Sequence, residues 1–159
     1  MGRTWPFWVF VALLVLFHFL LHVGLGLGAM APDLLTVAVL LAARRLASGP
    51  AAALGLSLGL LQDALSLGSF GAEAVSQTLL AFAGARSRDF FMGESAFFVA
   101  GYLFLGKWLH DAVFFLLAHM GGGAEALSRL LVQAPLGGLY AAACGMLALS
   151  LYRAATGER

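Results

Sequence analysis

The chain has 159 residues, of which 62% are hydrophobic and 11% are charged, and its mean hydropathy is +0.94. Soluble domains carry about 25% charged residues, so this composition excludes a water-soluble globular domain and predicts an all-α membrane protein. The net charge of +1 gives no indication of nucleic-acid binding, and the single cysteine, Cys144, excludes an internal disulfide.

The first predicted membrane span covers residues 5–27. Arg3 precedes this apolar run, and Ala29 and Ala31 have the spacing of a signal-peptide cleavage site. The apolar run is longer than the roughly 7–15 residues of a signal-peptide core, and further apolar segments follow at once. We therefore expect the run to remain in the protein as a span.

Five further spans are expected, which gives a single domain over residues 1–159 with six helices in a bundle. The span at 32–43 has only about 12 residues, below the roughly 17 that cross a bilayer. This segment either crosses a thinned region, extends into its flanks or enters the membrane without crossing it. The expected spans after the first are 32–43, 51–67, 72–85, 95–118 and 126–152.

Basic residues predict how the spans are oriented. They occur at every second boundary between spans, and the intervening connections hold acids and glycines without Lys or Arg. Because positive charge stays on the cytoplasmic side, the pattern places both termini in the cytoplasm. The residues concerned are Arg3, Arg44, Arg45, Arg86, Arg88, Arg153 and Arg159.

Two spans carry small and polar residues at four-residue steps. Membrane helices associate through close approach of small residues, so these faces are expected to point toward other helices. Asp63 and Gln133 lie on them and are therefore expected between helices and not against lipid. A packing contact with a hydrogen bond is the simplest interpretation of both. The two faces are Ala51, Gly55, Gly59 and Asp63, and Arg129, Gln133, Gly137, Ala141 and Gly145.

The span at 95–118 holds Lys107, His110 and Asp111 within one helical turn. Lys107 is about 16 Å from either end of this span, too far for its side chain to reach water fully. It needs a buried partner or local water, with Asp111 as the first candidate and Asp63 as the second. A structural ion pair and a functional site both remain open.

The other polar residues give no catalytic or metal-binding pattern. His18 and His22 lie one turn apart, but a zinc site needs a third ligand, so no metal is predicted. Gln77 lies one turn after Glu73 at the start of the fourth span, and an acid near the positive end of the helix dipole is the simplest interpretation of Glu73. Since no G-x-S-x-G, H-E-x-x-H or phosphate-loop pattern occurs, we expect neither an enzyme nor a cofactor.

Three stretches resemble a known family. They are Pro32-Asp33-Leu34-Leu35 at the start of the short span, Arg44-Arg45 at its end, and Gly55-x-x-x-Gly59-Leu60-Leu61-Gln62-Asp63 with Gly68 and Gly71 after it. Together with the chain length and short loops, they resemble MreD, the rod-shape-determining membrane proteins. The recurring positions of that family correspond here to Pro32, Asp33, Gln62 and Asp63, whereas the family pattern assigns no role to Lys107 or the histidines.

The resemblance implies a noncatalytic scaffold of the bacterial elongasome. Such a scaffold binds MreC, and acts with MreB, RodA and a class B penicillin-binding protein in lateral peptidoglycan synthesis and rod cell shape. A second copy of the chain, as a homodimer, is a further candidate partner.

Two other functions stay open. The MreD family is similar in fold to the substrate-binding subunits of energy-coupling-factor vitamin transporters, and polar residues in the outer half of the spans are candidates to line a cavity for such a ligand. Those subunits typically carry Ala-x-x-x-Ala in the first span, whereas here Ala12 is followed four residues later by Leu16. A proton-coupled channel through Lys107 and Asp111 is the third hypothesis.

Overall fold

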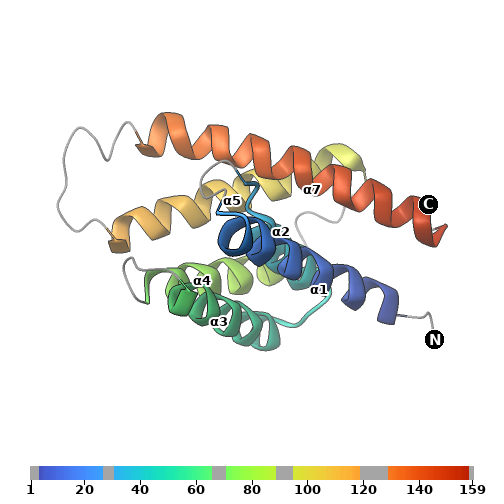
Figure 1. The fold of residues 1–159 in the computed structure, drawn as a ribbon, viewed down its shortest axis with the longest axis horizontal. Helices are drawn as coiled ribbons and strands as arrows, with labels where there is room; N and C mark the ends of the chain where they lie inside the picture. Colours follow the sequence, from blue (N-terminus) through green and yellow to red (C-terminus); the bar gives the residue numbers. More distant parts are fainter. Residues whose placement is uncertain (1–3, 27–30, 66–70, 89–94, 119–128, 158–159) are drawn as a thin grey trace.

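A computed structural model describes residues 4–26, 31–65, 71–88, 95–118 and 129–157, except the side chain of Arg129. These residues form α-helices and no strand, which confirms the all-α prediction (Figure 1). The predictions on Arg3, Ala29, Gly68 and Arg159 lie outside the described residues. The elements are α1 (Trp5–Phe19) with the π-helical turn η1 (Leu20–Gly24), α2 (Leu34–Ala43), α3 (Ser48–Leu65), α4 (Ala72–Ser87), α5 (Ala96–Ala118), and the π-helical turn η3 (Arg129–Gln133) that leads into α7 (Ala134–Thr156).

Three helical segments are long and apolar enough to cross a membrane. They are Trp5–Gly24, Ala96–Ala118 and Leu130–Thr156. Their outer faces expose large apolar side chains such as Leu16, Leu116 and Leu147, as expected for surfaces that meet lipid. The chain therefore has the character of a membrane protein.

Helix α2 is the centre of the bundle. All ten of its residues are buried, and it contacts α1, α3, α4, α5 and α7. A helix that is apolar on every side is stable only when other helices surround it. This explains why the apolar segment is short, since a ten-residue helix is about 15 Å long and needs only to fill the core.

Helices α3 and α4 form a close pair. The buried residues of α3 are Ala51, Gly55, Gly59 and Asp63, the face that the sequence predicts. A Cβ atom on Gly59 would lie 2.6 Å from the Cα of Ala74, so the two helices approach through backbone contact. Gly71 precedes α4 with a φ of 96°, a left-handed conformation that glycine adopts without strain.

The basic helix ends gather at one end of the bundle. The Arg45 guanidinium lies 3.7 Å from the centre of the Phe7 ring near the start of α1. Arg88, at the end of α4, donates a 3.2 Å hydrogen bond to the carbonyl of Leu46. The start of α1 and the end of α7 lie at this same end (Figure 1). The boundaries between predicted spans that carry Arg45 and Arg88 thus lie at the same end of the helices.

The face predicted on the last span is only partly buried. Ala141 and Gly145 are buried against the bundle, and Gly137 is half-buried. Gln133 is exposed, and it lies on the wall of a cavity that residues of α4 and α5 also line. It belongs to η3, the π-helical turn that leads into α7.

Candidate functional site

A cluster of polar side chains lies in the bundle, in the half away from the basic end. Three elements supply it: the start of α2, the first turns of α4, and the middle of α5. We call it the central polar cluster. Its members are Asp33, Thr36, Glu73, Gln77, Lys107, His110 and Asp111.

Lys107 makes two ion pairs. Its Nζ lies 2.5 Å from Oδ1 of Asp111 and 2.8 Å from Oδ2 of Asp33, and all three side chains are less than one fifth exposed. The predicted pairing with Asp111, one turn along the same helix, is confirmed. The second partner is Asp33 and not Asp63, because the buried α2 begins beside α5 and carries Asp33 at its start.

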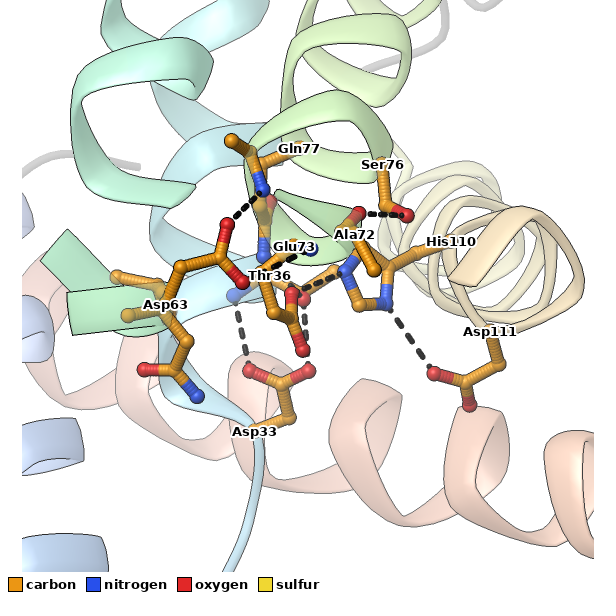
Figure 2. A network of polar contacts seen from close by, with 12 residues as sticks. Asp33, Thr36, Asp63, Ala72, Glu73, Ser76, Gln77, His110 and Asp111 are labelled. Atoms are coloured by element: carbon orange, nitrogen blue, oxygen red, sulfur yellow. Dashed lines mark hydrogen bonds and ion pairs between the residues drawn. The ribbon is translucent and has the colours of Figure 1, made fainter. Parts of the chain in front are cut away.

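Asp33 also caps α2. Its Oδ1 accepts a 3.1 Å hydrogen bond from the backbone N–H of Thr36, and its Oδ2 accepts one of 2.7 Å from the Thr36 hydroxyl. Side chains that accept from the first free N–H groups of a helix stabilise that helix end. Figure 2 shows Asp33 beside Thr36 at this helix start. Asp33 therefore fixes the start of α2 and holds Lys107 at the same time.

His110 lies between two carboxylates. Its Nδ1 is 3.2 Å from Oδ1 of Asp111, and its Nε2 is 3.0 Å from Oε2 of Glu73 (Figure 2). An ionised carboxylate only accepts hydrogen bonds, so the imidazolium form, with an N–H on each nitrogen, satisfies both contacts. The sequence interpretation of Glu73 as a helix-start acid missed this long-range partner.

Gln77 extends the cluster along α4. Its Nε2 donates a 3.1 Å hydrogen bond to the Thr36 hydroxyl, and its side chain is buried. Within the part of the chain that the structure describes, its Oε1 has no hydrogen-bond partner. Buried amide oxygens of this kind commonly hold an ordered water.

His18 joins α1 to α2 and α3. Its Nδ1 accepts a 3.2 Å hydrogen bond from the backbone N–H of Leu35, so its Nε2 carries the proton and donates to Oε1 of Gln62 at 3.1 Å. His22 stacks on the His18 ring with centroids 4.1 Å apart. Among the described residues, no group of three or more His, Cys, Asp or Glu side chains is arranged to hold a metal ion.

Asp63 anchors the start of α4. The side chain is buried, and its two oxygens accept hydrogen bonds from the backbone N–H groups of Glu73 at 3.2 Å and Ala74 at 2.9 Å. A carboxylate at this position satisfies free N–H groups and complements the positive helix end. Asp63 thereby sets the position of Glu73 and, through it, of His110.

A cavity of about 310 Å³ opens beside the cluster. Gln133, the exposed residue of η3, lies on its wall together with aromatic and charged side chains of α5. The cavity is large enough for a small ligand and holds groups that bind and orient ions. Its lining residues are Glu73, Lys107, His110, Asp111, Phe114, Phe115, Gln133 and Ala134.

Comparisons of the chain with protein-family models, with characterised proteins and with solved structures give no match. Evidence for function therefore comes from the motifs and from where the fold places them. Of the predicted site residues, Asp33, Lys107 and Asp111 meet directly. Gly55, Gly59, Gln62 and Asp63 lie on α3, where they position α4 and His18. Pro32 directly precedes the Asp33 cap.

Proposed function

We propose that the chain is a noncatalytic membrane scaffold of the bacterial elongasome, with six helices in the inner membrane and both termini in the cytoplasm. It binds MreC and, with MreB, RodA and a class B penicillin-binding protein, helps direct lateral peptidoglycan synthesis. Three long apolar helices and the shared end of the basic residues support this placement.

One observation carries the proposal. The residues behind the resemblance to MreD also hold the helices together: Asp33 caps α2 and pairs with Lys107, and Asp63 caps α4. Gln62 accepts a hydrogen bond from His18 of α1. A motif that joins five helices keeps their outer faces in fixed register, which suits a protein that offers helix surfaces to partners.

Co-purification tests the proposal. The affinity-tagged full chain, expressed at native level and extracted in mild detergent, is expected to retain MreC in stable amounts. A single-span protein with an unrelated membrane segment serves as the control and should be lost on washing. Absence of MreC from the purified material, with the chain itself intact, would contradict the scaffold.

Asp63→Leu is expected to reduce the yield of the MreC complex several-fold and to disturb rod shape. The substitution leaves two N–H groups at the start of α4 unpaired, at a cost of about 1–3 kcal/mol. Ser57→Leu is the matched control, because Ser57 is exposed on the same helix and donates its hydrogen bond to the carbonyl of Ala53, one turn earlier in α3. The measurements are complex yield and cell shape, and equal values for both variants would refute the prediction.

A second candidate is the substrate-binding subunit of an energy-coupling-factor vitamin transporter. The polar cavity beside Glu73 and Asp111 favours it, because a soluble ligand needs such a site. The absence of Ala-x-x-x-Ala around Ala12 speaks against docking on a transporter partner. A vitamin retained by the detergent-purified protein would favour this candidate over the scaffold.

A further inference from the structure

Two carboxylate oxygens at the cavity have no hydrogen-bond partner among the described residues. His110 binds Oε2 of Glu73 and Oδ1 of Asp111, which leaves Oε1 of Glu73 and Oδ2 of Asp111. Both residues line the cavity, and both side chains are 16% exposed. Two acceptor oxygens therefore border a space that a donor can enter.

The cluster also has a surplus of negative charge. Among the described side chains, the three carboxylates of Asp33, Glu73 and Asp111 face Lys107 and His110. The net charge of these five side chains is −1 when His110 is protonated and −2 when His110 is neutral. Uncompensated charge in a poorly hydrated site is costly, so the site favours a cation.

The cationic groups at the cavity are already engaged. Both nitrogens of His110 contact carboxylates, and the Nζ of Lys107 contacts two of them. Few donors remain for an anion, whereas acceptors remain for a cation. An anionic ligand is thereby disfavoured.

Aromatic rings complete the wall. The Phe114 ring is nearly parallel to the His110 ring, at 11° with centroids 6.3 Å apart, and Phe115 meets Phe114 edge-on at 6.1 Å. The faces of such rings attract cations by about 0.5–2 kcal/mol. Phe114 and Phe115 therefore favour an organic cation over a strongly hydrated metal ion.

We propose that this cavity binds a small organic cation through a primary ammonium group, which donates hydrogen bonds to Glu73 and Asp111. Its volume of about 310 Å³ accommodates a soluble amine or the ethanolamine headgroup of a lipid. The proposal rests on the cavity and its charges, and it holds whether or not the chain is an elongasome scaffold.

The test uses the full chain purified in a detergent that contains no ethanolamine lipid. Ethanolamine at ten times its Kd is expected to raise the apparent Tm by about 3–5 °C relative to sodium chloride at equal ionic strength. In a second arm, phosphatidylethanolamine is compared with phosphatidylglycerol of the same acyl chains. A rise in Tm with ethanolamine shows that a soluble amine is sufficient for binding. A rise in Tm with phosphatidylethanolamine alone identifies the lipid headgroup as the ligand.

Glu73→Gln tests the site itself. The amide oxygen still accepts the hydrogen bond from His110, but the charge is lost, so affinity for the amine should fall about tenfold or more. Asp111→Asn should act in the same direction. Glu158→Gln is the control, because it changes the net charge equally at the penultimate residue of the sequence.

A ligand series keeps the test decisive if the variants fold poorly. Choline carries the same charge as ethanolamine without N–H donors, so it should bind the unaltered chain at least tenfold more weakly. Three results would each overturn the proposal: choline binding as tightly as ethanolamine, equal Tm shifts in Glu73→Gln and Glu158→Gln, or no Tm shift with ethanolamine together with equal Tm shifts for the two lipids. Failure of MreC to co-purify leaves these outcomes unaffected, so the two proposals fail separately.

Discussion

Lys107→Met is expected to lower the free energy of unfolding by about 3–5 kcal/mol. The substitution removes the cation from two ion pairs and leaves the carboxylates of Asp33 and Asp111 in a poorly hydrated site. Loss of one partner of a buried pair costs more than the pair itself contributes, because the remaining charge stays desolvated. The measurement is thermal unfolding of the purified chain in detergent.

Two further variants make this prediction specific. Adding Asp33→Asn and Asp111→Asn to Lys107→Met should recover part of the lost stability, because the unpaired charges are removed with the cation. Arg86→Met removes a positive charge from an exposed residue of α4 and should cost less than about 1 kcal/mol. If Lys107→Met unfolds at the same temperature as the unaltered chain, the ion pairs do not stabilise the bundle.

The sequence predicts those parts of the site that depend on local spacing. Gly55, Gly59 and Asp63 share a face because four-residue steps align on a helix, and the structure buries that face. Lys107 and Asp111 meet for the same reason. Both predictions need only helical geometry and no knowledge of which helices are neighbours.

The contacts between distant helices were beyond prediction from spacing. Lys107 with Asp33 and His18 with the N–H of Leu35 depend on the central position of α2, and His110 with Glu73 depends on the packing of α4 against α5. Composition does not distinguish a short buried helix from a short span, because both are apolar on every side. The position of Lys107 in the middle of a predicted span, with only Asp111 as a local acid, was the one sequence feature that indicated a second ion-pair partner.

Helix α3 organises the central polar cluster through its contact with α4. The backbone contact of α3 with α4 sets the distance over which Asp63 reaches the N–H groups of Glu73 and Ala74. Glu73 in turn contacts His110, and His110 contacts Asp111. Small residues on α3 thus determine the geometry of charged groups on α5.

Gly55→Ala and Gly59→Ala are therefore expected to destabilise the chain by about 2–3 kcal/mol each. A Cβ on Gly55 would collide with the carbonyl oxygen of Gln77, and one on Gly59 would lie 2.7 Å from the carbonyl oxygen of Glu73. Both obstacles are backbone atoms of α4, which no side-chain rotation relieves. The helices must separate, and the bonds from Asp63 to α4 lengthen as they do so.

Gly101→Ala is the matched control for these two variants. Gly101 lies within α5, and a Cβ built there meets no atom within 4 Å. Alanine favours the helix by about 1 kcal/mol over glycine, so the control should leave the apparent Tm unchanged or raise it slightly. If Gly55→Ala and Gly59→Ala have the same apparent Tm as Gly101→Ala, then α3 and α4 separate at little cost in free energy. In that case the α3 face does not fix the position of Glu73.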